Sequence, residues 1–255
     1  MNRRHLITAA AALSVPGAGA TVKNAIFELR YFRLRNGAQN QRTSDFFGKY
    51  YLPAAQRLGI GPLGFFNAVI AEQSPFLLAL TSYPSLSGLE SAMEKMASDR
   101  EFQKGFDEYN SMSELSYIRM ESSLLRAFDS IPNIQVPPTA GKRAPRIFEL
   151  RTYESNNNKA SKTKIKMFDD AEIKIFRSAG MLPVFFGETL IGKNMPNLTY
   201  MLAYDDWDAR DKVWRTFGAD PEWQKLRSTP GLTDPEIVSN ISNAILRPLP
   251  FSPIR

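Results

Sequence analysis

Two pairs of oppositely charged residues recur at equivalent places in this 255-residue chain. Glu28 and Arg30 lie in the alternating segment 26–35, where a β-strand would point both side chains to one face. Glu149 and Arg151 repeat the arrangement 121 positions later. A guanidinium can hold a carboxylate or phosphate through two hydrogen bonds, and a desolvated glutamate can act as a general base. The pattern therefore indicates a polar clamp for an anionic ligand.

The same pairs also have a structural interpretation. Opposite charges on neighbouring strands form ion pairs that fix the register of a sheet, and such networks are common where charges are buried. We favour this interpretation for the two Glu-x-Arg pairs and keep the clamp as the functional alternative.

Three further side chains are candidates. Tyr83 and Tyr204 end equivalent strand-like segments, where a phenol either packs in the core with one hydrogen bond or donates to a bound carbonyl. Glu188 follows two phenylalanines, so it is either a base with a raised pKa or a solvent-facing residue at a strand edge. The catalytic candidates are thus Glu28, Glu149 and Glu188, and the ligand-binding candidates are Arg30, Arg151, Tyr83 and Tyr204.

The composition excludes several kinds of site. The chain has no cysteine, and its single histidine, His5, lies in the N-terminal segment. These facts exclude a cysteine nucleophile and, once that segment is removed, a Ser-His-Asp triad and the usual zinc sites. No Asp/Glu spacing suggests a hard-cation site, so we expect no metal and no cofactor. Because the 32 basic residues are scattered among 26 acidic ones, we expect no nucleic-acid partner.

Residues 1–20 have the pattern of an export signal. Arg3 and Arg4 precede an apolar run that is too short for a membrane anchor, and small residues ending at Ala20 supply a cleavage site. The adjacent arginines resemble a twin-arginine signal, although Leu6 stands where such signals usually have Phe, so the general secretion route stays open. We expect a periplasmic or secreted protein with no integral membrane segment after cleavage.

The elements that must position the candidate residues also occur twice. The first copy predicts strands at 26–35, 63–71, 76–83 and 116–128, with helices from Thr43 or Ser44 and at 86–96. The second predicts strands at 146–153, 182–191, 198–204 and 237–246, with helices at 159–179 and 207–217. This βαββαβ order is ferredoxin-like. The predicted organisation is an export signal 1–20, a first module 25–128, a linker 129–145, a second module 146–248 and an extended surface tail 249–255.

Each module would be an antiparallel sheet with helices on one face only. The other face would expose a large apolar surface, which is unfavourable, and two such sheets in one chain can cover each other. The sequence therefore predicts an α+β fold in which two tandem ferredoxin-like modules pack sheet-to-sheet as an intrachain pseudo-dimeric α+β barrel. The cleft between the sheets is the natural place for a ligand.

Two motifs connect the chain with a known family. The strand Ile26–Arg30 and its copy Ile147–Arg151, together with the Asp-x-Glu-(Phe/Trp)-Gln-Lys segments at 99–104 and 220–225, resemble the NIPSNAP family over residues 25–128 and 146–248. The resemblance implies the dimeric α+β barrel superfamily, whose members include cofactor-independent and haem-degrading monooxygenases. The activity of the NIPSNAP family itself is poorly defined, and a fold does not fix a function.

Three functions stay open, and the sequence does not decide whether the protein is an enzyme. The leading hypothesis is an exported protein that binds a small organic molecule in the inter-sheet cleft. The second is a cofactor-independent monooxygenase or isomerase, with a cleft glutamate as base and an arginine that stabilises an oxyanion. The third is an interaction module that meets a partner or a second copy through its outer surfaces. The first two require a cleft of roughly a few hundred Å³, whereas the third permits a filled barrel.

Overall fold

The computed structural model describes residues 24–111, 115–138 and 146–255. The predicted export signal, with its cleavage at Ala20, and part of the predicted linker lie outside the described residues. Within the described ranges, no helix is long and apolar enough to cross a membrane.

The two copies fold in the same order of elements. The first contains β1 (Ile26–Arg33), α1 (Ala38–Phe46), the π-helical turn η1 (Phe47–Tyr51), α2 (Leu52–Arg57), β2 (Leu63–Ile70), β3 (Phe76–Tyr83), α3 (Leu86–Ser98), α4 (Arg100–Asn110) and β4 (Arg119–Ala127). The second contains β5 (Ile147–Glu154), α5 (Asn158–Met167), the π-helical turn η2 (Phe168–Glu172), α6 (Ile173–Ser178), β6 (Leu182–Ile191), β7 (Asn197–Tyr204), α7 (Trp207–Ala219), α8 (Pro221–Arg227), α9 (Asp234–Ile237) and β8 (Asn240–Pro248). The predicted βαββαβ order is confirmed in both copies.

The eight strands form one closed antiparallel barrel, in the order β1-β3-β2-β8-β5-β7-β6-β4. Each copy contributes four neighbouring strands. The copies join at two seams, where β2 pairs with β8 and β4 pairs with β6. The predicted packing of sheet against sheet is therefore completed by hydrogen bonds between their edges, and none of these eight strands has an unpaired edge.

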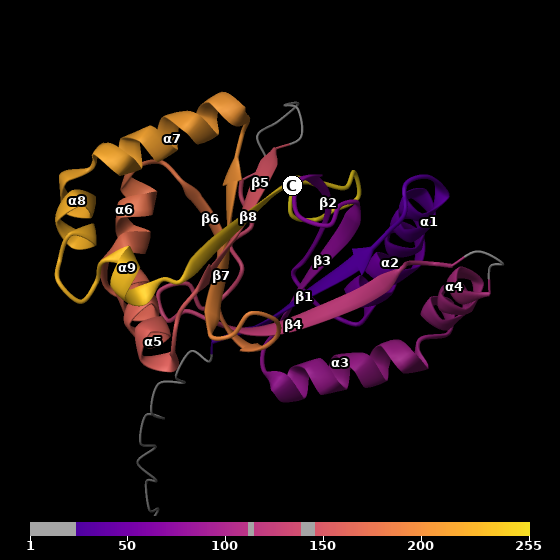
Figure 1. Ribbon diagram of the computed structural model, residues 1–255. Coiled ribbons are helices and arrows are strands. Elements are labelled where there is room, and N and C mark those ends of the chain that lie inside the picture. The colour runs from indigo at the N-terminus through magenta and orange to yellow at the C-terminus, as the bar shows by residue number, and fades with distance from the viewer. Residues whose placement is uncertain (1–23, 112–114, 139–145) are drawn as a thin grey trace, which may run out of the picture.

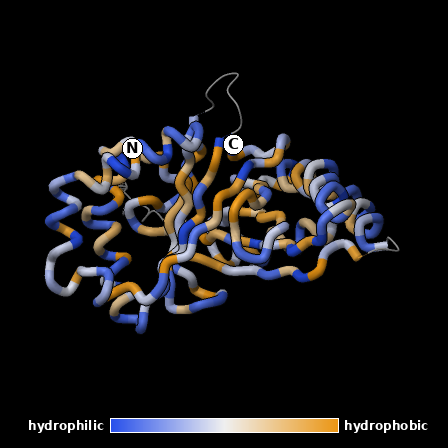
Figure 2. Tube along the Cα trace, turned by 45° about the horizontal axis from the view of Figure 1, so that its top comes forward, coloured by the Kyte–Doolittle hydropathy of each residue, from blue (hydrophilic) through white to orange (hydrophobic). Residues whose placement is uncertain are grey.

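The helices form two layers outside the barrel. Figure 1 shows α1–α4 on one side of the strands and α5–α9 on the opposite side. In Figure 2 the central strands are mostly hydrophobic, whereas the outer helices mix hydrophobic and hydrophilic residues. Both faces of a strand are thus covered, one by the barrel interior and the other by helices.

The alternation along β1 assigns residues to these two environments. Phe27 and Leu29 belong to the core inside the barrel, which combines side chains from both copies. Phe32 belongs to the core between the first sheet and its helices. Glu28 and Arg30 therefore share the helix-covered face, since successive side chains on a strand point to opposite faces.

The repeated Asp-x-Glu motif has a structural role at the start of a helix. Asp99 caps α4 by accepting a hydrogen bond from the backbone N–H of Phe102, and Asp220 caps α8 by accepting one from the N–H of Trp223. Such caps satisfy donors that the first helical turn leaves unpaired. The motif that recurs in the sequence is therefore a repeated helix start.

One end of the barrel is filled with apolar side chains. It is the end where β1 and β5 begin, and it contains Phe27, Phe66, Phe148, Phe185, Leu246 and Ile254, all of them buried. Ile254 belongs to the C-terminal tail, which was predicted to lie on the surface in extended form. The structure corrects this prediction, because Ile254 is 0% exposed.

The tail is also held by hydrogen bonds. The Ser252 hydroxyl accepts from the backbone N–H of Phe65 at 2.9 Å and donates to the carbonyl of Ile254 at 2.8 Å. The prolines of the tail concealed this role in the sequence, since a proline-rich segment usually lacks a packed core.

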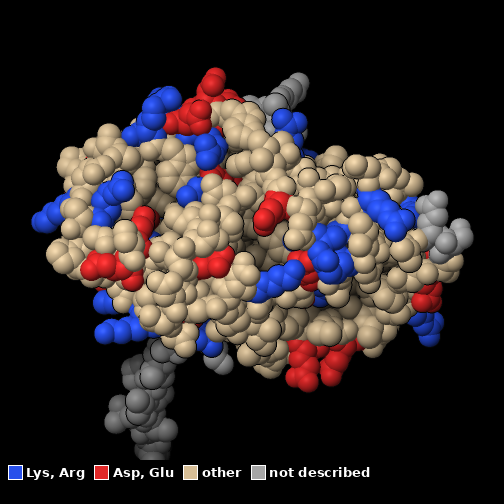
Figure 3. Space-filling view, viewed as in Figure 1, with Lys and Arg blue, Asp and Glu red and all other residues tan. Residues whose placement is uncertain are grey.

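Charges of both signs are interspersed on the outside of the molecule. On the face seen in Figure 3, lysines and arginines lie among aspartates and glutamates and form no single continuous basic patch.

Candidate functional site

The barrel is open at the end opposite the tail. A cavity of about 460 Å³ lies between the ends of β1 and β5 and the beginnings of β3, β4, β7 and β8. Its apolar side chains include Leu29, Leu125, Leu150 and Phe76, and its polar ones include Arg33, Glu121, Thr152, Thr189, Lys193, Asn197 and Thr199. One end of the barrel interior is thus packed and the other is open.

Two other concavities lie outside the barrel. One of about 610 Å³ is bounded by α1 and the C-terminal tail, and one of about 580 Å³ adjoins the start of α3. The first groove is formed by the first copy and by Leu249, Pro250 and Phe251 of the tail, and the second by the first copy and its flanking residues. The barrel cavity is smaller, but it lies within the fold and is lined by strands of both copies, which makes it the better candidate for a site.

Three cations surround one carboxylate at the rim of this cavity. Glu121 accepts from Arg33 Nη2 at 3.1 Å and from Arg119 Nε at 2.6 Å, and Lys193 Nζ lies 2.8 Å from its Oε2. Desolvation opposes the charge on Glu121, but the hydrogen bonds from Arg33, Lys193 and Arg119 outweigh it and lower the pKa of this carboxyl to about 2. Glu121 is therefore ionised at neutral pH.

Arg33 is held at the rim by aromatic rings. Its guanidinium lies 4.8 Å from the ring centroid of Tyr31 and 4.9 Å from that of Phe76. This geometry is a cation–π contact, which also orients the guanidinium plane. The Nε of Arg33 is buried and has no hydrogen-bond partner. Burial raises the pKa of Tyr31 to about 12, so its phenol is neutral and can donate.

The second copy supplies a wall of neutral polar groups. The hydroxyls of Thr152 and Thr199 lie 2.9 Å apart, and the Thr189 hydroxyl donates to Asn197 Oδ1 at 2.6 Å. Asn197 Nδ2 donates to the carbonyl of Lys193 at 2.8 Å, which ties the β6–β7 turn to the wall. The cavity is therefore asymmetric, with charges from β1, β4 and the β6–β7 turn facing hydroxyls and an amide from β5, β6 and β7.

The first predicted Glu-x-Arg pair lies outside the cavity. Glu28 accepts from Arg30 Nη2 at 2.7 Å, from the Ser122 hydroxyl at 2.8 Å and from the Tyr83 hydroxyl at 3.1 Å. The cavity is lined instead by Leu29 and Tyr31 of the same strand. The polar clamp required Glu28 and Arg30 to face the space between the sheets, but they lie between the sheet and its helices, where they form an ion pair as the favoured structural interpretation supposed.

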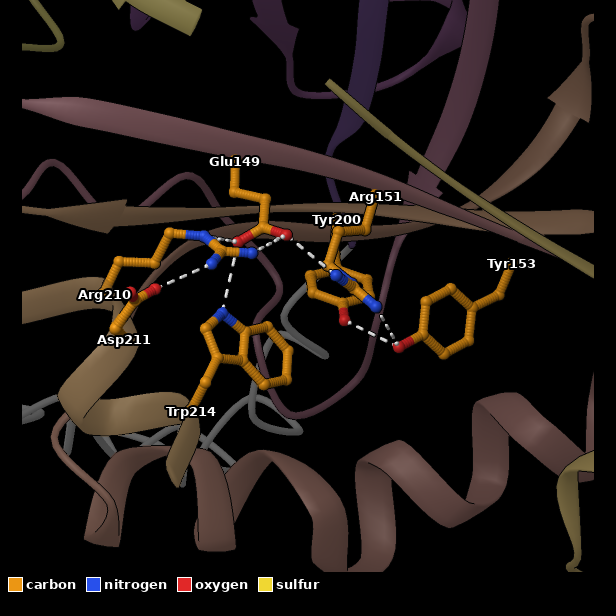
Figure 4. A network of polar contacts seen from close by, with 7 residues as sticks. All are labelled: Glu149, Arg151, Tyr153, Tyr200, Arg210, Asp211 and Trp214. Carbon is orange, nitrogen blue, oxygen red and sulfur yellow. Dashed lines mark hydrogen bonds and ion pairs between the residues drawn. The ribbon is translucent and has the colours of Figure 1, made fainter. Parts of the chain in front are cut away.

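The second predicted pair belongs to a larger buried cluster, shown in Figure 4. Glu149 is 0% exposed and accepts from Arg151 Nη1 at 2.7 Å, from Arg210 Nε at 2.8 Å and from Trp214 Nε1 at 3.2 Å. The ion pairs run along β5 and across to α7, rather than between strands. Desolvation opposes ionisation of Glu149, but its bonds to Arg210 and Arg151 lower its pKa, so it is a weak base.

The remaining candidates are also placed away from the cavity. Tyr204, the counterpart of Tyr83, is buried beside Glu149 and Trp214. Burial raises the pKa of both phenols. Glu188 forms an ion pair with Lys162 at 2.6 Å on the outside of the second copy. The structure therefore does not bring the seven predicted site residues together.

A second buried ion pair lies under the helices of the second copy. Lys164 Nζ is 3.1 Å from Glu172 Oε2, and both side chains are almost completely buried, at 1% and 2% exposure. The ammonium also lies over the rings of Tyr153, Phe168 and Trp223. Glu172 ends the π-helical turn η2, which interrupts the helix that the sequence predicts as continuous over 159–179. Burial raises the pKa of Glu172 to about 7, although Lys164 opposes this shift.

This shift predicts a pH dependence of stability. Because the folded pKa of Glu172 exceeds its unfolded value of about 4.5, folding favours the protonated carboxyl. Its contribution is complete below about pH 4.5 and is lost as the pH rises to about 7. We expect wild type to lose about 1–3 kcal/mol relative to Glu172→Gln between pH 5 and pH 7.5, measured by urea unfolding. A Glu172→Gln curve that runs parallel to that of wild type would contradict the assignment.

The rim residues Arg33, Glu121 and Lys193 were not predicted from the sequence. A usable signal was present, because the two copies differ at these positions. Their counterparts at the 121-residue offset are Glu154, Ser242 and Glu72. Each rim residue therefore differs in charge from its counterpart in the other copy.

The closed eight-stranded barrel, with helices outside and a cavity at one end, defines the dimeric α+β barrel class, here completed by two copies within one chain. The family model of NIPSNAP matches residues 27–131 and 148–253, which covers both copies. The chain belongs to the NIPSNAP family.

Solved structures of low sequence identity share the whole fold. A candidate monooxygenase from Fusobacterium nucleatum subsp. nucleatum ATCC 25586 is similar with a TM-score of 0.58 and 9% identity, over 90% of this chain and 94% of its own. A candidate monooxygenase from Lactobacillus acidophilus NCFM gives 0.56 and 10% identity, over 88% and 93%. These two likenesses establish the fold alone.

A NIPSNAP-like domain protein of uncharacterised function from Burkholderia xenovorans is 27% identical over 42% of this chain and 89% of its own, with a TM-score of 0.38. No curated protein matches the sequence.

Proposed function

We propose that this NIPSNAP-family protein binds a small organic molecule in the open half of its barrel. The observation that carries the proposal is the division of the interior: aromatic and aliphatic side chains fill one end, and a cavity of about 460 Å³ occupies the other. Ligand cavities of proteins commonly measure about 300–1,000 Å³ and combine an apolar lining with a few polar groups. The volume lies in this range, and the lining combines apolar side chains with a larger number of polar ones.

Two ionisable groups of the lining, Glu121 and Tyr31, favour binding over acid–base catalysis. A general base works best when its pKa lies near the working pH. The pKa of Glu121 is lowered to about 2 and that of Tyr31 is raised to about 12. The three glutamates considered as bases from the sequence lie outside the lining. These facts support a binding protein as the first proposal and leave the enzyme hypothesis without a supporting observation.

A neutral fluorescent probe can test the proposal. N-phenyl-1-naphthylamine is apolar and compact, so its fluorescence should rise when it enters the cavity. Ala244 lines the cavity with a small side chain, and Ala244→Phe would fill part of the space. We expect this substitution to weaken probe binding at least about tenfold, because an occupied cavity excludes the ligand by steric overlap.

The matched control is Ile241→Phe. Ile241 is on the same strand, is 39% exposed and is not part of the cavity lining. Circular dichroism and thermal unfolding confirm that both variants fold. Equal probe affinity in the two variants and in wild type would contradict binding inside the barrel.

The expected place of this binding, the periplasm or the outside of the cell, stays a proposal that rests on residues 1–20. N-terminal sequencing of the protein purified from its native cells tests it, and a chain that retains Met1 would refute cleavage.

A further inference from the structure

Three cations converge on one carboxylate at the rim of the cavity. Arg33, Arg119 and Lys193 all contact Glu121. Glu72 also lines the cavity and Glu154 accepts from Asn194 of the lining, so positive and negative charges balance at the rim and the placement of the cations is its distinguishing feature. The cations lie at the entrance to a partly enclosed space within the barrel. In such a space, an anion interacts with these charges more strongly than it would in open water.

The same rim already binds a carboxylate, that of Glu121. Its Oε2 lies 3.1 Å from Arg33 and 2.8 Å from Lys193, and its Oε1 lies 2.6 Å from Arg119. These are short, charge-assisted contacts with nitrogen donors. The arrangement shows that three side chains from separate elements are placed at distances that suit one carboxylate group.

Arg33 has further binding capacity. Its Nη2 donates to Glu121 and its Nη1 to the carbonyl of Glu72 at 3.5 Å, whereas its Nε is buried and has no hydrogen-bond partner. A buried donor without a partner is unfavourable, so a small shift of the guanidinium that brought Nε to an oxygen atom of a ligand would satisfy it. The guanidinium lies over the rings of Tyr31 and Phe76, which restrict its orientation.

The lower part of the cavity is apolar. Leu29, Leu125 and Leu150 line it, and the hydroxyls of Thr152 and Thr199 bond to each other. A ligand that fits both regions has an apolar body and one anionic end.

We propose that the ligand is an apolar organic acid, whose carboxylate lies at Arg33 and Lys193 and whose hydrocarbon or aromatic body occupies the lower part of the cavity. This inference rests on the proposed function. Glu121 would act as an internal competitor: it holds the two cations in the free protein and shares them with the ligand carboxylate.

The test compares two ligands of the same shape and different charge. 1-Naphthoate and 1-naphthamide compete with the neutral probe N-phenyl-1-naphthylamine at pH 7. We expect wild type to prefer naphthoate by about tenfold or more, since charge-assisted hydrogen bonds are the stronger kind. Sodium chloride at 0.5 M should reduce the preference, because salt screens partly exposed charges.

Three variants assign the preference to the rim. Arg33→Gln should reduce it to about twofold or less. Glu121→Gln should increase it, because the variant removes the competing carboxylate and leaves the cations. Lys166→Gln is the control for a lost positive charge, since this lysine of α5 is exposed and pairs with Asp170 of η2; its preference should equal that of wild type.

Each outcome bears on one proposal or on both. Equal affinity of wild type for naphthoate and naphthamide, or an unchanged preference in Arg33→Gln, overturns the organic-acid inference while cavity binding stands. If Glu121→Gln prefers naphthoate less strongly than wild type does, the role of Glu121 as a competitor is overturned as well. Calorimetry measures naphthoate binding without the probe, and the absence of binding by probe and naphthoate alike overturns both proposals.

Discussion

Glu149→Ala is expected to lower the free energy of unfolding by about 3–5 kcal/mol, the range typical of a buried ion pair that loses one partner. Glu149 is fully buried and compensates the guanidiniums of Arg151 and Arg210. Without it, Arg151 loses its anion in a buried position, whereas Arg210 keeps its ion pair with Asp211 at 3.2 Å. Arg151 is the more affected of the two, because its side chain is 13% exposed and its Nε already has no partner.

The matched comparison is Glu28→Ala, the same change in the first copy. Glu28 compensates a single guanidinium, that of Arg30, and its other donors are neutral hydroxyls of Tyr83 and Ser122. We expect a smaller loss of about 2–3 kcal/mol, since only one buried charge is left unpaired. Urea unfolding monitored by tryptophan fluorescence measures both.

Glu149→Ala also distinguishes a structural role of Glu149 from a role in ligand binding. Because Glu149 does not line the cavity, the folded fraction of Glu149→Ala should bind N-phenyl-1-naphthylamine with wild-type affinity. A large loss of affinity at unchanged stability would instead support the polar clamp that the sequence suggested.

Ile254→Ala is expected to cost about 2–4 kcal/mol, as for other aliphatic side chains truncated in a packed core. Ile254 is the second residue from the C-terminus, yet it belongs to the core inside the barrel. Ile254 packs directly against Gly64 of β2: a Cβ atom added at Gly64 would lie 3.2 Å from Ile254 Cδ1. Truncation would leave a void at the filled end, because the neighbouring strands are held by the barrel and cannot collapse inward.

Pro253→Ala is the control, since Pro253 is exposed and adjoins Ile254 in the chain. It should change the free energy of unfolding by less than about 0.5 kcal/mol. Thermal and urea unfolding of the two variants provide the comparison. Equal stability of Ile254→Ala and wild type would show that the tail merely covers the barrel and does not contribute to its core.

The repeat made the fold predictable in advance. Residues separated by 121 positions imply two equal modules, and the apolar face that each module would expose implies that the modules cover each other. The seams add information that the pattern lacked: β2 with β8, and β4 with β6, form hydrogen bonds between the copies.

The face of each strand could not be predicted from alternation alone. In β1, Leu29 and Tyr31 line the cavity and Glu28 and Arg30 lie under the helices, but a strand buried on both sides shows no polar face that would mark the exterior. An ion pair on the helix-covered face has the same Glu-x-Arg spacing in the sequence as an ion pair in a binding cleft. The strands that carry Glu28 and Arg30 could therefore be predicted, whereas the face to which these side chains point could not.

The burial of the tail and the residues of the rim could not be predicted from the sequence, for different reasons. Ile254 is an isolated aliphatic residue among prolines, with no periodicity to indicate burial. Arg33, Glu121 and Lys193 lie far apart in the chain, and only closure of the barrel brings them together. Their divergence from Glu154, Ser242 and Glu72 was visible in the sequence and is the type of signal that should be sought in other fused repeats.

Closure of the barrel within one chain has a consequence for how such a protein can evolve. In a dimer of identical subunits, twofold symmetry introduces every substitution at the rim twice, so a new positive charge always arrives with its duplicate across the opening. Here each residue of the chain occurs only once in the barrel. Arg33 and Glu154 occupy equivalent places with opposite charge, a state that identical subunits cannot reach. Covalent linkage of the two copies thereby gives selection access to asymmetric ligands by single substitutions.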